Sequence, residues 1–115
     1  MPVQYTSILE EHRTVRSAVG LFDLSHMGEV HAGGPEALAF VRYAVVSDPG
    51  ALEPGQAQYS MLCTDEGGII DDLMVTRSAA AEDDGSLMLV ANAARKAVDF
   101  AHIAERLPDD VSLQP

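Results

Sequence analysis

The chain contains two runs rich in apolar residues, Gln58–Cys63 and Ile69–Thr76, joined by the five residues "TDEGG". Two such runs around a short loop that contains glycine are typical of a β-hairpin. This hairpin restricts the fold more than any other feature of the sequence. Together with helices elsewhere in the chain, it favours an α+β fold with an antiparallel or mixed sheet over a parallel α/β sheet.

The other elements are predicted from the spacing of apolar residues and from turn and cap residues. Three flanking helices are expected: 6–19, capped by Thr6 or Ser7 and closed by Gly20; a stretch after Pro35 with the apolar stripe Leu38, Val41, Ala44 and Val45; and about 93–107 with the apolar face Ala97, Phe100, Ala101, Ala104 and Leu107. Further strands are expected near Met27–Ala32, over Ser86–Ala91 after the acidic loop "AAAEDDG", and at the C-terminal end.

The length and composition are those of one small globular domain, which we assign to residues 1–115. Eighteen acidic residues against seven basic ones give a net charge of -11, and no basic cluster is present. This balance argues against binding to nucleic acid or to an anionic membrane. The chain also lacks a signal peptide and any apolar stretch near the roughly 20 residues of a membrane span. We therefore expect a cytoplasmic protein, and the ending "LPDDVSLQP" suggests a fragment.

The second strand of the predicted hairpin carries two adjacent aspartates, Asp71 and Asp72. Aspartate is unusual inside a strand, because a buried charge without a partner is costly. Side chains alternate along a strand, so the two carboxylates should face opposite sides of the sheet and should not share a proton. Periodicity does not decide which of the two points inward. The plain alternative is that both lie near the turn, in solvent or bonded to backbone amides.

Other polar residues have plain interpretations. His26 in "DLSHMG" lies beside a serine and an aspartate, but sequence neighbours rarely form a catalytic triad, so we expect a loop-fixing role. The remaining histidines lack the spacing of metal ligands, and we predict no metal site. Cys63 is expected to be a buried structural thiol, because no basic neighbour activates it. Asn92 is interpreted either as a helix N-cap or as a ligand-facing amide.

Three stretches carry a family resemblance: "PVQYTSILEEHRTVRSAVGLFDLSHMGEV" at 2–30, "QYSMLCTDEGGIIDDLMV" at 58–75 and "LMLVANAARKAVDF" at 87–100. They resemble the aminomethyltransferase family, the T-protein of the glycine cleavage system. The resemblance covers nearly the whole chain in the right order. It implies the folate-binding region of an enzyme that is longer than this chain and whose folate cavity is built by several domains.

The resemblance also implies an activity and a set of site residues. Members of this family pass the aminomethyl-derived one-carbon unit from the lipoyl arm of the H-protein to tetrahydrofolate and release ammonia. The second aspartate of "IDDL", here Asp72, corresponds to the family's acid at the folate ring nitrogens. By the same comparison Tyr59 and Asn92 match folate-contacting positions, and Met74 matches an apolar wall of that pocket. Met27 is a further candidate, as a wall of the lipoyl or folate cavity.

Two other functions remain open from the sequence. The same folate module is similar to parts of the sarcosine and dimethylglycine dehydrogenases and of other one-carbon demethylases, and a flavin-binding domain in the flanking sequence would indicate these. A non-enzymatic folate-binding member of the superfamily is the third possibility. Such a protein should fail to transfer the aminomethyl group from a loaded H-protein.

Overall fold

A computed structural model of the chain describes residues 3–80 and 86–114. Within these ranges the elements are α1 (Ile8–Ser17), β1 (Gly28–Gly33), α2 (Ala37–Ala44), the short 3-10 helix η1 (Pro49–Ala51), β2 (Ala57–Cys63), β3 (Ile69–Arg77), β4 (Leu87–Ala91), α3 (Lys96–Ala104) and β5 (Ser112–Gln114). The predicted α+β class is confirmed. Residues 81–85 of the expected acidic loop lie outside the described residues.

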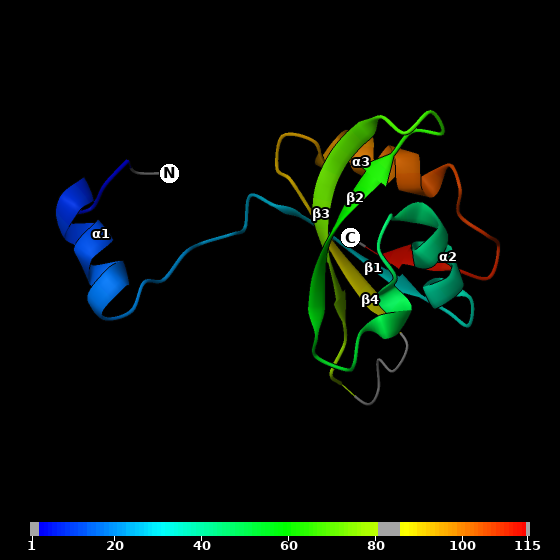
Figure 1. The fold of residues 1–115 in the computed structure, drawn as a ribbon, viewed down its shortest axis with the longest axis horizontal. Helices are drawn as coiled ribbons and strands as arrows, with labels where there is room; N and C mark the ends of the chain where they lie inside the picture. Colours follow the sequence, from blue (N-terminus) through cyan, green and yellow to red (C-terminus); the bar gives the residue numbers. More distant parts are fainter. Residues whose placement is uncertain (1–2, 81–85, 115) are drawn as a thin grey trace.

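The five strands form one sheet in the order β2-β3-β4-β1-β5, and every neighbouring pair is antiparallel (Figure 1). The predicted hairpin is the pair β2 and β3, with Tyr59 opposite Met74 and Leu62 opposite Asp71. The pairing shifts register between Leu62 and Cys63, close to the turn. The expected C-terminal strand is present as β5, which pairs with β1.

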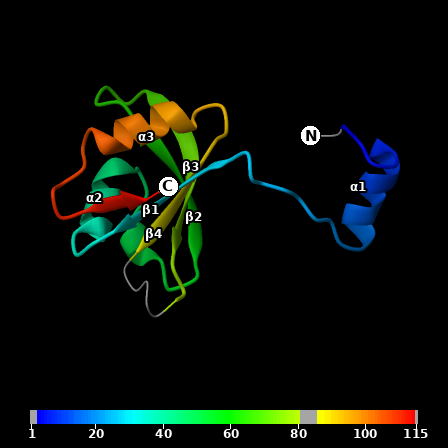
Figure 2. The ribbon, with the colours of Figure 1, turned by 180° about the vertical axis from the view of Figure 1, so that it is seen from behind.

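The hydrophobic core lies between one face of the sheet and the helices α2 and α3 (Figures 1 and 2). Strand residues alternate between this face and the opposite one, so β4 is buried at every second position. We call the first face the covered face and the opposite one the open face. The core side chains are Val30, Ala32, Ala37, Phe40, Val41, Val45, Leu52, Leu62, Leu73, Val75, Leu87, Leu89, Ile103 and Val111.

Both core helices are shorter than predicted, and α3 is also turned differently. Of the stripe expected after Pro35, Val41 and Val45 are buried and Ala44 packs against the core, whereas Leu38 is exposed. In α3 the buried residues are Asp99 and Ile103. Phe100 and Leu107 of the expected face pack partly buried against the core, and its alanines are exposed. The apolar alanines of α3 gave a misleading stripe, because small side chains contribute little buried area.

The first helix lies apart from the sheet, at the end of an extended segment (Figure 1). Ser7 caps it by accepting a hydrogen bond from the Glu10 N–H at 3.2 Å, as one of the two predicted caps. The helix ends at Ser17, before the Gly20 expected to close it. No residue of α1 is buried, so the body of the fold is built from residues after about Met27.

Candidate functional site

The aspartates of β3 lie where the neighbouring strand β4 has ended. Leu73 pairs with Ala91, the last residue of β4, while Asp72 and Asp71 still pair with Met61 and Leu62 of β2. Asn92 follows directly in the sequence and therefore lies beside the two aspartates. Both aspartates lie near the hairpin turn, as in the plain interpretation, but they are half-buried and bond to a side-chain amide instead of backbone amides.

The side-chain amide of Asn92 joins the two aspartates. Its Nδ2 lies 3.2 and 3.3 Å from the Asp71 carboxylate oxygens, 3.0 Å from Oδ1 of Asp72 and 3.1 Å from the Asp72 carbonyl oxygen. All of these atoms are acceptors, so the NH2 group and not the amide oxygen must face them. Two amide hydrogens are shared among four acceptors, and Asn92 therefore holds both carboxylates in one cluster.

The N-cap interpretation of Asn92 is wrong. Helix α3 begins at Lys96, Arg95 occupies the cap position, and no side chain caps the helix by a hydrogen bond. The Asn92 carbonyl oxygen instead accepts from the Arg95 and Lys96 N–H groups at 3.0 and 2.9 Å, closing a turn that leads into α3. This turn leaves the Asn92 side chain directed to β3.

The structure decides the orientation that periodicity left open. Asp71 is in phase with Leu73 and Val75, which are buried on the covered face. Asp72 is in phase with Met74, on the open face. Although alternation separates the two side chains, both still reach one amide, because β4 no longer occupies the space beside them.

A third aspartate joins the cluster from the covered face. Asp99 of α3 is fully buried, its carboxyl oxygens have no hydrogen-bond partner among the described residues, and Asp71 points to the same covered face. Burial, followed by interaction with the Asp71 carboxylate and its negative charge, raises the pKa of Asp99 to about 6. Two carboxyl groups that face each other can hydrogen-bond only through a proton on one of them, so a neutral Asp99 suits this arrangement.

A cation lies at the edge of this acidic cluster. The Arg95 guanidinium donates from Nη2 to the Ile70 carbonyl oxygen at 3.1 Å. Its positive charge lowers the pKa of Asp99, but by less than burial and Asp71 raise it. Neither Arg95 nor Asp99 was among the residues predicted for the site. An acid between Val98 and Phe100 in a helix with apolar character is the signal that would have found Asp99.

The other predicted site residues lie on or near the open face. Tyr59 is opposite Met74 in the register, so the two side chains share the face that carries Asp72. The Tyr59 side chain is 66% exposed and free to contact a ligand. Met27 is half-buried. It lies just before Gly28, whose pairing partner is Ala91, and Asn92 comes just after Ala91. Met27 and Asn92 therefore lie at the same end of the sheet.

The remaining sequence candidates do not join this cluster. The Ser25 hydroxyl donates to Oδ1 of Asp23 at 2.5 Å, and all three residues of that motif, including His26, are exposed. Cys63 is half-buried rather than fully buried. Among residues 3–80 and 86–114, no group of three or more His, Cys, Asp or Glu residues is arranged to hold a metal ion.

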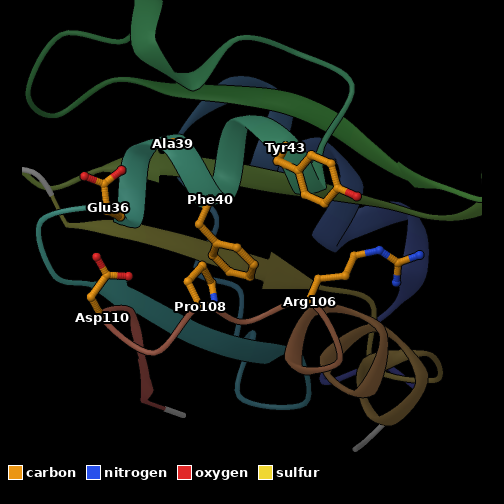
Figure 3. Close-up of a pocket in the computed structure, with 7 residues that line it drawn as sticks. All are labelled: Glu36, Ala39, Phe40, Tyr43, Arg106, Pro108 and Asp110. Carbon is orange, nitrogen blue, oxygen red and sulfur yellow. The ribbon is translucent and has the colours of Figure 1, made fainter.

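A depression of about 310 Å³ lies on the helix side of the fold, lined by α2 and by the segment after α3 (Figure 3). Phe40 and Pro108 form its floor, with Glu36 and Asp110 near one end and Arg106 near the other (Figure 3). None of the predicted site residues lines it. Of the three aspartates, Asp72 is the one whose side chain lies on the open face.

The antiparallel sheet, the helices on one face and the Asp-Asp-Asn cluster at the strand ends define an α+β domain with a polar cluster where β4 ends. The chain belongs to the family described as the GCVT N-terminal domain, which it matches over residues 1–115.

Named relatives agree with this assignment. The chain is 50% identical over 103 residues to a protein of Thermus thermophilus named aminomethyltransferase, covering 90% of this chain and 28% of that protein. A protein of Geobacillus kaustophilus with the same name is 43% identical over 114 residues, covering 99% of this chain and 30% of the relative.

A crystal structure of the glycine cleavage system aminomethyltransferase T from Bartonella henselae superposes with a TM-score of 0.70 at 40% identity. It covers 80% of this chain and 25% of that protein. The chain therefore spans less than a third of the length of these relatives.

Proposed function

We propose that this chain forms one wall of the folate site of a glycine cleavage aminomethyltransferase, with Asp72 as its functional acid. In the complete protein, the one-carbon unit of an aminomethyl group on a lipoyl-bearing H-protein is transferred to tetrahydrofolate, and ammonia is released. Glycine catabolism would thereby supply one-carbon metabolism. The family membership and the names of the relatives support the class of reaction.

The observation that carries the proposal is the placement of Asp72. Its carboxylate lies on the open face, is half-buried and is held at 3.0 Å by the Asn92 amide. A fixed carboxylate can accept a hydrogen bond from a ring nitrogen of the folate and stabilise positive charge that develops during transfer. Holding the acid by a neighbouring amide reduces the reorganisation that the reaction requires.

The residues around Asp72 suit a flat ligand with a polar edge. Tyr59 and Met74 offer an aromatic ring and a polarizable thioether on the same face, and Met27 lies toward the same end of the sheet. Aromatic and methionine side chains pack well against a planar ring, while Asp72 and Asn92 can read its hydrogen-bonding groups. The remaining walls would come from parts of the complete protein outside this chain.

The proposal includes a protein partner and a location. The donor is the lipoyl arm of the H-protein, and we expect the complete enzyme to act in the cytoplasm. Within the described residues no helix has the length and apolar character required to cross a membrane. The relatives named here are aminomethyltransferases, which favours this reaction over that of a folate-dependent demethylase.

The first prediction concerns Asp72→Asn in the complete protein. This substitution keeps the size of the side chain and removes its charge, so turnover should fall roughly 10²- to 10³-fold. The assay is ammonia release from an aminomethyl-loaded H-protein in the presence of tetrahydrofolate, with the unfolding temperature measured in parallel. The unfolding temperature should change little.

The matched control is Glu29→Gln, which removes an exposed carboxylate of β1 on the same open face. It should leave turnover near the wild-type value. Near-normal turnover of Asp72→Asn would remove Asp72 from the mechanism. Failure of the wild-type complete protein to release ammonia in this assay would overturn the aminomethyltransferase function itself.

A further inference from the structure

Asp99 is unusual among the buried residues of the described chain. Ser60 and Asp99 are the two buried polar residues there, and the Ser60 hydroxyl accepts a hydrogen bond from the Ser47 hydroxyl at 2.7 Å. Both carboxyl oxygens of Asp99 are buried without a donor group beside them. A buried carboxyl group in this situation is costly unless it carries its own proton and gives it to an acceptor.

The acceptor available to Asp99 is the Asp71 carboxylate, because Asp71 is in phase with the buried residues of β3 and so points to the covered face on which Asp99 is buried. Asp71 in turn accepts from the Asn92 amide at 3.2 and 3.3 Å, and the same amide donates to Asp72 at 3.0 Å. The contacts therefore run from the buried side of α3 through Asp71 and Asn92 to the acid on the open face. Such a network fixes each member more firmly than isolated pairs would, provided that every member is satisfied.

We propose that Asp99 is a positioning residue of this site: as a neutral acid it donates its proton to Asp71, and through Asn92 it fixes the carboxylate of Asp72. Asp99 touches neither the open face nor a ligand there. This inference rests on the proposed function, because it takes Asp72 as the functional acid. It adds a residue to the site that lies on the opposite side of the sheet.

A purely structural role would not require a carboxyl group at this position. Asp99 packs in the same layer as Ile103, where an apolar side chain would be less costly to bury. The charged groups that face Asp99 are Asp71 and Asp72 from β3 and Arg95 from the turn before α3. When Asp99 loses its proton, the donor to Asp71 disappears and a third negative charge joins the cluster, so the position of Asn92 should change with pH.

The test compares Asp99→Asn and Asp99→Leu in the complete protein. The asparagine is neutral at every pH and can still donate to Asp71, whereas leucine has a similar size and no donor. Asp99→Leu should weaken tetrahydrofolate binding and slow turnover roughly tenfold to hundredfold, as expected when a functional group loses its orientation. Asp99→Asn should stay close to the wild type below about pH 6, where Asp99 carries its proton, and should exceed the wild type above that pH, where only the asparagine still donates.

A second readout is independent of activity. The ¹⁵N resonances of the Asn92 side-chain amide, identified by their loss in Asn92→Ala, are followed from pH 4.5 to pH 8 without folate. We expect an inflection near pH 6 in the wild type and none in Asp99→Asn. An Asp99 that only fills space in the core, without a connection through Asp71 to Asn92, would give no inflection of the Asn92 amide in the wild type.

Several outcomes would overturn the inference. These are an inflection that persists in Asp99→Asn, an Asn92 signal that does not titrate in the wild type, or equal damage to turnover by asparagine and leucine. If Asp99→Leu fails to fold, the comparison of the wild type with Asp99→Asn across pH still decides. A wild-type protein that shows the inflection but transfers no aminomethyl group would refute the proposed function and leave the positioning network in place.

Discussion

The two faces of the sheet differ in what they contribute. The covered face is lined by Leu73, Val75 and Leu89, each no more than 2% exposed, and packs against α2 and α3. The open face carries half-buried or exposed residues, among them Tyr59, Met74 and Asp72. Residues of the first face determine whether the chain folds, and residues of the second are available to a ligand. Because β3 buries Leu73 and Val75 on the covered face, it can be stable and still carry Asp72 on the open face.

The adjacent aspartates Asp71 and Asp72 lie at the boundary between these faces. The phase of β3 directs one to each face, and the end of β4 allows Asn92 to reach both. The polar cluster thus crosses the sheet at the one end where the hydrogen-bonded ladder of β3 and β4 is finished. Placing it in the middle of the sheet would have required burying unpaired charge beside β4.

The largest effect on stability is expected for Leu89→Ala on the covered face. Leu89 is 1% exposed, and removing its side chain should lower the free energy of unfolding by about 2–5 kcal/mol. Its neighbour Met88, half-buried on the open face, is the matched control, and Met88→Ala should cost less than about 1 kcal/mol. Urea unfolding of the 115-residue chain measures both. Equal losses of unfolding free energy in the two variants would show that side chains of the covered face contribute no more to stability than those of the open face.

The pH dependence of stability should separate the acid of the covered face from exposed acids. The pKa of Asp99 is raised to about 6 in the folded state, above the unfolded value near 3.9. At pH values between these two pKa values, the native state binds more protons than the unfolded state. The stabilisation from Asp99 is therefore complete below about pH 4 and is lost as the pH rises through about 6. The loss amounts to up to about 3 kcal/mol.

Asp99→Asn tests this prediction in a comparison of unfolding free energies at pH 4.5 and pH 7.5. The variant should lose less stability than the wild type between the two values, because its neutral side chain does not titrate. Asp109→Asn, which removes an exposed carboxylate, should follow the wild-type curve. If the unfolding free energy of Asp99→Asn changes with pH as much as that of the wild type, Asp99 does not hold a proton in the folded state.

The sequence predicted the hairpin well, because β2 and β3 are adjacent in the chain and their apolar runs are local signals. It could not orient Asp71 and Asp72, since that depends on which face α2 and α3 cover, a property of distant residues. The burial of Asp99 was missed for the same reason. An alanine-rich stripe indicated another face of α3, and only the packing of the helix on the sheet shows that Asp99 points inward.

A smaller effect should come from Gly28, where α3 approaches the first residue of β1 most closely. A Cβ atom at Gly28 would lie 2.6 Å from Cβ of Lys96 and 2.8 Å from Cζ of Phe100, so Gly28→Ala should push α3 away and cost about 1–3 kcal/mol. Gly33, at the other end of β1, is the control, because its added Cβ would meet only the Ser112 hydroxyl at 3.4 Å. Gly33→Ala should change the unfolding free energy by less than about 1 kcal/mol.

The same contact connects Gly28 to the aspartate cluster, because Lys96 and Phe100 flank Asp99 on α3. Gly28→Ala should therefore also shift the Asn92 amide resonance. An equally large shift in Gly33→Ala would contradict a local coupling between this contact and the cluster.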